Sequence, residues 1–148
     1  MYLRKDSGAN VMAISNVRHA SSFRPSCPSE AANRILASGG VALHHIDPSD
    51  HLSHGDPSIL PINFLRFSDD EWHRIAGNQF AYHNRLRATE YARLYEDSQH
   101  EVLIWKPHVD EASLRAVENG FPLDPKFREY SPEVLSTLVL QVVSRPSR

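Results

Sequence analysis

Short apolar runs alternate with helix-like segments along this chain of 148 residues, and this alternation is the feature that most limits its possible folds. The clearest run, Val41–Ile46, begins directly after Gly39-Gly40 and stops at Asp47-Pro48. Runs that predict further strands lie at Val11–Ile14, Glu101–Lys106 and Leu138–Val143. Strands that alternate with helices favour an α/β sheet with helices on its faces.

Four segments between these runs carry helix signals. A short helical pattern at Glu30–Leu36 is followed by the glycine pair, which is typical of a helix end. Ser68 and Glu71 form a capping box, which predicts a helix that ends near Ala76. The other two predicted helices are Thr89–Gln99, with an apolar stripe of Tyr91, Leu94 and Tyr95, and a short one after Asp110, with Leu114 and Val117 facing inward.

Proline is expected to interrupt two of the apolar segments. Pro61 divides Ile59–Phe67, which we therefore expect to pack as irregular chain. Pro107 is expected to stop the strand that begins at Glu101. Residues 16–29 and the link at 121–132 have no apolar period, so we expect loops there.

Composition excludes several classes of protein. The formal net charge of −2 gives no basic field for nucleic acid. Polar residues interrupt the longest apolar stretch, Leu135–Val143, which is far shorter than the roughly 20 residues of a membrane helix. The N-terminus has no signal-peptide core, so we expect a cytoplasmic protein. The single cysteine, Cys27, excludes an intramolecular disulfide and a cysteine-based zinc site.

The segment His44–His54 holds four histidines and two aspartates, a composition that suggests a metal site. Its spacing does not fit His-x-His-x-Asp-His, because the fourth residue after His45 is Ser49. The zinc pattern His-Glu-x-x-His is absent as well. We therefore predict no metal site and keep a metal-dependent hydrolase built on this cluster as an alternative.

The same segment follows a predicted strand, and ligands of open α/β sheets bind outside the carboxyl ends of strands. His45 is a candidate general base and Asp47 a candidate partner that orients it or holds a substrate group. Asp50 and His51 are candidate substrate-binding residues. The alternative is that all four are structural polar residues at the end of a strand.

A second candidate block, Asn84-Arg85-Leu86-Arg87, lies between an aromatic run and a predicted helix. Arg85 and Arg87 can bind a carboxylate or phosphate bidentately. They can equally pair with the acids Asp69, Asp70 and Glu71. The chain has neither a Gly-x-Gly-x-x-Gly loop nor a Walker lysine that would bind phosphate through backbone amides.

Together these blocks resemble the C-terminal half of class I S-adenosylmethionine-dependent methyltransferases. The resemblance rests on Ile35–Asp47, Asp50-His51, Ile62–Ser68, Trp72 and Tyr82–Arg87. In that family a helix ends in Leu-x-Pro-Gly-Gly and leads into the fifth strand; here Ser38 replaces the proline. Residues 1–28 form a poorly matching, loop-rich segment, and residues 29–148 form the methyltransferase-like part.

The resemblance implies an incomplete Rossmann-like sheet with parallel strands and a C-terminal antiparallel hairpin. Val11–Asn16 would be the fourth strand, which makes Ser15 and Asn16 candidate contacts of the cofactor, S-adenosylmethionine. Asn84, Arg85 and Arg87 would shape the site of a small-molecule methyl acceptor.

One departure from the family bears on activity. Its members bind the cofactor through a glycine-rich loop after the first strand and an acidic residue at the end of the second, and this sequence has no counterpart of either. We therefore expect a truncated chain that is inactive alone. Its uncovered apolar sheet edge should cause self-association, or should pair with a complete methyltransferase if the chain is a non-catalytic module.

Overall fold

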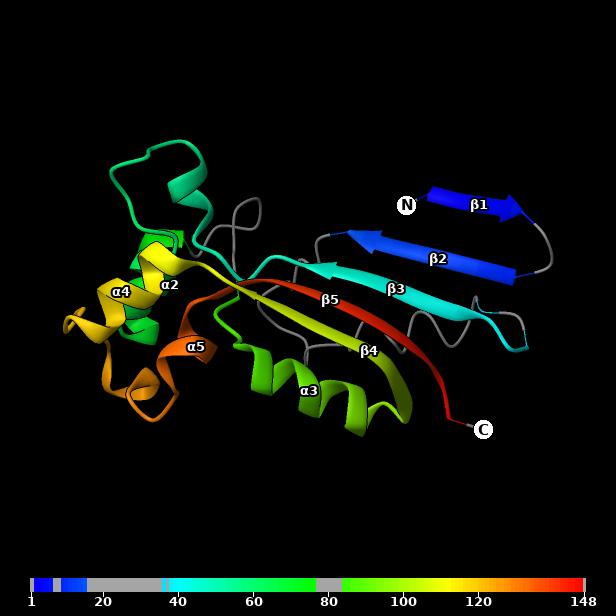
Figure 1. Ribbon diagram of the computed structural model, residues 1–148. Helices are drawn as coiled ribbons and strands as arrows, with labels where there is room; N and C mark the ends of the chain where they lie inside the picture. Colours follow the sequence, from blue (N-terminus) through cyan, green and yellow to red (C-terminus); the bar gives the residue numbers. More distant parts are fainter. Residues whose placement is uncertain (1, 7–8, 16–35, 37, 77–83, 148) are drawn as a thin grey trace.

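The computed structural model describes residues 2–6, 9–15, 36, 38–76 and 84–147. The described residues form a mixed α/β fold (Figure 1). The strands are β1 (Tyr2–Asp6), β2 (Ala9–Ser15), β3 (Val41–Ile46), β4 (His100–Val109) and β5 (Thr137–Pro146). The α-helices are α2 (Asp69–Ala76), α3 (Ala88–Asp97), α4 (Glu111–Glu118) and α5 (Pro132–Leu135), and 3-10 turns lie at η1 (His51–His54), η2 (Asn63–Arg66) and η3 (Pro125–Phe127).

All five strands belong to one sheet, in the order β1-β2-β3-β5-β4. β2 runs parallel to β3, with Ser15 opposite His45. β5 is antiparallel to both of its neighbours, so the last strand lies between β3 and β4. In Figure 1, α3 lies along one face of the sheet, and α2, α4 and α5 gather at the end to which β2 and β3 point.

Two sequence predictions about the strands are wrong. β4 does not stop at Pro107, which pairs with Leu140 and is followed by two further strand residues. Because β4 is an edge strand, its proline can turn toward the free side, where no ladder hydrogen bond is missing. The second concerns the uncovered sheet edge that we expected. β1, a strand that was not predicted, pairs antiparallel with β2 and covers its outer edge.

The helix predictions agree with the structure where it can be compared. The Ser68 hydroxyl accepts a hydrogen bond of 3.2 Å from the Glu71 amide, and the Glu71 carboxylate accepts one of 2.8 Å from the Ser68 amide, so the capping box begins α2. Asp110 caps α4 through the Ser113 amide, 2.7 Å away. The helix predicted at Glu30–Leu36 lies outside the described residues except for Leu36, and Gly39 has the positive φ of 75° that suits a helix end.

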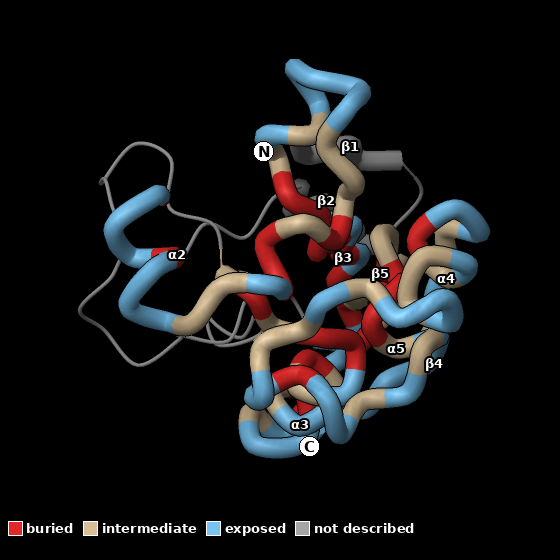
Figure 2. Tube along the Cα trace, turned by 90° about the vertical axis from the view of Figure 1, so that its left-hand side faces the viewer, coloured by how far each residue is buried: buried red, intermediate tan, exposed pale blue. Residues whose placement is uncertain are grey.

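Two apolar cores hold these elements together, and buried segments gather around β3, β5 and α3 (Figure 2). One core joins α3 to the sheet and contains Ile46, Tyr91, Tyr95, Leu140 and Val142. The other forms around the irregular segment after Pro61 and contains Ile62, Phe64, Leu65, Trp72, Ala76, Phe127 and Leu135. None of the described helices has the length and apolar character needed to cross a membrane.

Candidate functional site

The candidate site begins where β2 and β3 end side by side. Side chains of β3 alternate between the two faces, so His44 is buried against α3 whereas His45 is exposed on the other face. His45 lies opposite Ser15 in the parallel register. Asn16, the second candidate for cofactor binding, lies outside the described residues.

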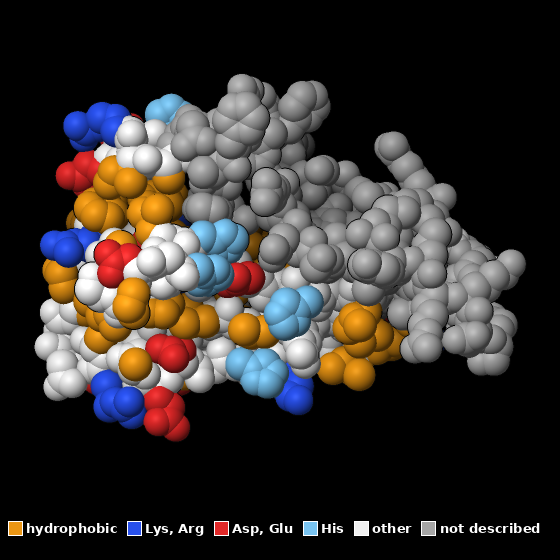
Figure 3. Space-filling view, turned by 90° about the horizontal axis from the view of Figure 1, so that it is seen from above, with side chains coloured by type: hydrophobic (Ala, Val, Ile, Leu, Met, Phe, Trp, Pro, Cys, Tyr) orange, Lys and Arg blue, Asp and Glu red, His pale blue; other side chains and the backbone are white. Residues whose placement is uncertain are grey.

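Asp47 organises the turn after β3. Its Oδ1 accepts hydrogen bonds from the Ser49 amide, at 3.0 Å, and from the Ser49 hydroxyl, at 2.5 Å. Its Oδ2 faces the Nε2 atoms of His51 and His54, at 3.4 and 3.8 Å, and the two imidazole rings stack with centroids 4.9 Å apart. Figure 3 shows histidine side chains gathered beside an acidic side chain on this surface.

The geometry limits the chemistry of this cluster. The Ser49 hydroxyl lies 3.1 Å from Nε2 of His54, but the same nitrogen faces Asp47. A Ser-His-Asp triad needs the serine and the carboxylate on opposite ring nitrogens, so these residues do not form one. Among the described residues, no group of three or more His, Cys, Asp or Glu side chains is arranged to hold a metal ion. The cluster can hold a hydroxyl or amine group and can exchange a proton with it.

Asp50 is completely buried and supports the loop from inside. Its Oδ1 accepts a 3.0 Å hydrogen bond from the Leu52 amide and so caps η1. Its Oδ2 lies 3.5 Å from the side-chain amide of Asn63, and its own amide donates to the Pro61 carbonyl at 2.7 Å. Asp50 is thus enclosed by its own loop, whereas His51 remains partly exposed beside Asp47.

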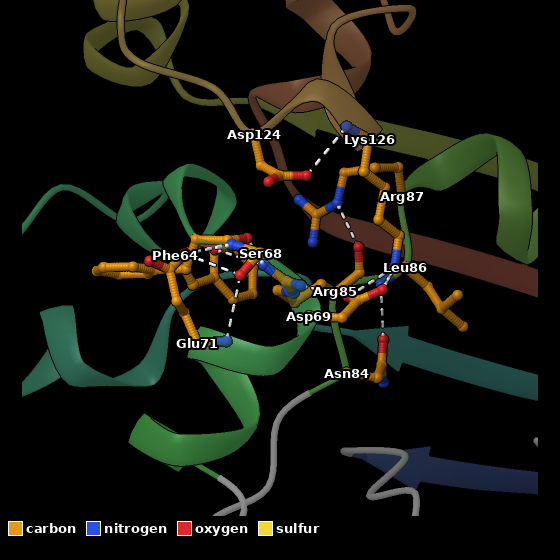
Figure 4. A network of polar contacts seen from close by, with 11 residues as sticks. Phe64, Ser68, Asp69, Glu71, Asn84, Arg85, Leu86, Arg87, Asp124 and Lys126 are labelled. Carbon is orange, nitrogen blue, oxygen red and sulfur yellow. Dashed lines mark hydrogen bonds and ion pairs between the residues drawn. The ribbon is translucent and has the colours of Figure 1, made fainter.

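Arg85 pairs with an acidic residue, Asp69 (Figure 4). Its guanidinium donates to the carbonyl oxygens of Phe64 and Phe67 and pairs with the Asp69 carboxylate. Lys126 binds the same carboxylate, with both oxygens at 2.9 Å. Hydrogen bonding from Lys126, aided by Arg85, holds the pKa of Asp69 below its ordinary value of 3.8.

Arg87 is completely buried at the start of α3. Its Nε donates to the Arg85 carbonyl at 3.1 Å, its Nη2 donates to the Pro48 carbonyl at 2.9 Å, and its guanidinium lies 5.1 Å from the centre of the Phe64 ring. Burial lowers the pKa of Arg87 to about 10, which still leaves it charged at neutral pH. The guanidinium is therefore enclosed by protein and holds the backbone of the turn at Pro48.

Asn84 connects the same block to α3. Its side-chain oxygen accepts hydrogen bonds from the Leu86 amide and from the Tyr91 hydroxyl, both at 3.0 Å. Burial raises the pKa of Tyr91 above its ordinary value of 10.0. Within this block, Arg87 bonds to the turn after Asp47. Among the candidate residues whose burial is described, His45 is exposed, and Asp47, His51 and Asn84 are partly exposed.

Several residues that hold the candidate site residues in place were not predicted from the sequence. Ser49 and Asn63 fix Asp47 and Asp50, and Lys126 reaches Asp69 across 57 residues of sequence, a distance that leaves no local signal. The Nδ1 atom of the buried His44 contacts the Tyr95 hydroxyl, and burial together with the nearby His100 lowers the pKa of His44 to about 4. Strand alternation already set His44 and His45 on opposite faces; which face is covered depends on α3.

Comparison of the chain with protein-family models, with curated proteins and with solved structures found no significant match.

Proposed function

We propose that this chain is a methyltransferase-like protein that takes part in S-adenosylmethionine-dependent methylation of a small molecule. The observation that carries the proposal is the parallel register of β2 and β3, which brings Ser15 and His45 together at the carboxyl ends of adjacent strands. Asp47 and His51 follow directly. Ligands of open α/β sheets bind at such ends.

The sheet supports the resemblance to class I methyltransferases. The segments expected as fourth and fifth strands are adjacent and parallel as β2 and β3, and the last two strands, β4 and β5, are adjacent and antiparallel. These relations support an incomplete Rossmann-like sheet, in which α3 covers one face.

In this proposal His45 is the general base. Its ring is exposed, and an acceptor hydroxyl or amine that receives a methyl group must lose a proton to such a base. Asp47 accepts a hydrogen bond from the acceptor, beside His51. S-adenosylmethionine supplies the electrophilic methyl group when bound, and Ser15 fits a contact with it because it ends β2 beside His45.

Asn84, Arg85 and Arg87 take positioning roles in this proposal. Arg87 fixes the carbonyl between Asp47 and Ser49, and Arg85 holds the carbonyls of Phe64 and Phe67 below. They shape the acceptor site by holding its loops in place.

Isothermal titration with S-adenosylmethionine tests the cofactor assignment. The chain alone is expected to give little heat, because its sequence has no glycine-rich cofactor loop. A fusion that places such a loop and the acidic residue of the family ahead of β2 is expected to bind tightly. A folded fusion that does not bind the cofactor would contradict the proposal.

The acceptor side is tested in the same fusion by methylation of a panel of small hydroxyl and amine compounds. His45→Gln should lower kcat by about 100-fold or more. The matched control is His73→Gln, which changes an exposed histidine on α2. Equal effects of the two substitutions would exclude His45 as the base.

The second candidate is a non-catalytic module that pairs with a complete methyltransferase, and the exposed edge of β4 favours it. Co-purification with such an enzyme tests this candidate. A metal-dependent hydrolase is not proposed, because the side chains of His44–His54 do not form a group of three or more ligands arranged to hold a metal ion.

A further inference from the structure

β4 is an unusually exposed edge strand. It ends the sheet order, and from Glu101 to Val109 every side chain is exposed except that of Trp105, which is half-buried. The exposed set includes large apolar side chains, with Ile104 at 53% exposure; the others are Val102, Leu103 and Val109. Natural proteins seldom leave a long apolar edge of this kind without a partner strand.

The pairing of β4 with β5 shows which side chains share a face. Glu101 lies opposite Arg145 and Lys106 opposite Gln141, two residues of β5 that point to the same face. The register shifts between Val102 and Ile104, so Leu103 is an extra residue. Because of this bulge, Glu101 and Lys106 share a face although they are five positions apart.

The bulge also places Val102 and Trp105 on one face of β4, opposite the face of Glu101 and Lys106. Val102 lies opposite Ser144 and Trp105 opposite Val142, and both of these β5 side chains are buried toward α3. Beside this face, Trp105 lines an apolar hollow of about 260 Å³ together with Pro107, Val109 and residues of α3 and α5.

We propose that two copies of this chain associate by antiparallel pairing of β4 with β4, centred between Leu103 and Ile104. This register places Glu101 opposite Lys106 of the second copy, and the two-fold symmetry forms the same pair twice. Val102 then lies opposite Trp105 of the second copy, at the rim of the hollow.

Charge complementarity favours a second copy of the chain as the partner of β4 and favours this register over its neighbours. A slip of two residues in either direction places Glu101 opposite Ile104 or His108 and separates it from Lys106. The Glu101 carboxylate is already oriented by Arg145, whose Nε donates to it at 2.7 Å. Opposite charges directly across two strands stabilise their pairing, and like charges weaken it.

Sedimentation velocity over a range of concentrations tests the proposal on the full chain. The wild type is expected to form a discrete dimer. Glu101→Lys and Lys106→Glu each create two like-charged pairs and should weaken the dimer by about tenfold or more. An equimolar mixture of the two variants should recover the dimer, because each variant then supplies the charge that the other needs.

Two controls separate this interface from other effects. Glu118→Lys makes the same charge change on the exposed face of α4 and should leave the dimer unchanged. Far-UV circular dichroism and thermal melting should show that all variants fold. In the dimer, amide hydrogens of β4 should exchange more slowly than in dilute monomer.

Several outcomes would overturn the proposal. These are a monomer at every concentration, a dimer that both charge variants leave intact, or a mixture that fails to recover the dimer. Pairing only with a different protein, or association without a discrete stoichiometry, would overturn it as well.

Discussion

The guanidinium of Arg87 donates a 2.9 Å hydrogen bond to the carbonyl oxygen of Pro48, and Arg87 is completely buried. The bond joins the start of α3 to the turn after β3, across 39 residues of sequence. Pro48 stands between Asp47 and Ser49, so this contact fixes the backbone that carries the accessible part of the candidate site. Together with the bond from Nε to the Arg85 carbonyl, it binds the buried guanidinium to backbone oxygens.

Arg87→Ala is expected to destabilise the protein by about 3 kcal/mol, because it leaves a cavity and two buried carbonyl oxygens without donors. Urea denaturation measures this change. The control is Arg115→Ala, which removes an exposed pair with Glu111 at 3.2 Å and should cost less than about 1 kcal/mol. Equal costs for the two substitutions would show that the bond to Pro48 does not hold the turn.

His44 should make stability fall in acid. Its pKa is lowered from 6.5 to about 4 in the folded protein, so the unfolded chain binds the proton first as the pH drops. The contribution of His44 to the free energy of unfolding should fall between these two values, by up to about 3 kcal/mol. His44→Gln should flatten the pH dependence of stability in this range. An unchanged slope in the His44 variant would contradict the assignment.

Asp69→Asn should weaken the protein by less than about 1 kcal/mol at neutral pH, because the carboxylate is largely exposed although Lys126 and Arg85 both bind it. The folded pKa of Asp69 is lowered, so its stabilising contribution is present above the ordinary pKa of 3.8 and is lost as the pH falls toward the folded value. The difference between variant and wild type, measured by urea denaturation, should therefore shrink in acid. A difference that grows in acid would be inconsistent with this pairing.

Asp47 and Asp56 form a natural matched pair. Each begins an Asp-Pro-Ser turn in which its Oδ1 accepts from the amide and hydroxyl of the serine, but only Asp47 also faces His51 and His54. Asp47→Ala should lower the free energy of unfolding by about 2 kcal/mol, because its turn is partly buried, and Asp56→Ala should lower it less, because its turn is exposed.

Side-chain nuclear magnetic resonance of the histidines adds a second readout for this pair. Asp47→Asn should shift the imidazole nitrogen signals of His51 and His54, whereas Asp56→Asn should leave them in place. Identical spectra for the two variants would show that the cluster at Asp47 does not exist in solution.

Local sequence signals were sufficient where the cause of a structure is local. The Ser68 and Glu71 pair predicted the start of α2, and Asp110 predicted the start of α4, because the capping bonds lie within three residues. The proline rule failed at Pro107, because its effect depends on whether the strand has a neighbour on both sides. β1 was missed because its pairing with β2, and not its own composition, makes it a strand.

The candidate site divides in the same way. His45 lies near the end of β3, and Asp47 and His51 lie just after it, so their order in the chain was enough to predict that they lie close together. The roles of Arg85 and Arg87 stayed open in the sequence, because binding a ligand and pairing internally require the same side chain. In the structure both guanidinium groups are buried and bond to backbone carbonyl oxygens, those of Phe64 and Phe67 for Arg85 and that of Pro48 for Arg87.

The sequence by itself therefore determined the alternation of strands and helices, the caps, and the polar end of β3, since each depends on residues within one or two turns of chain. Only the tertiary structure decided which side chains are covered. The pairing of β5 between β3 and β4 left β4 at the edge, and the packing of α3 buried His44 while His45 stayed exposed. Burial depends on neighbours that are distant in sequence, and that contact information is not written in any local pattern.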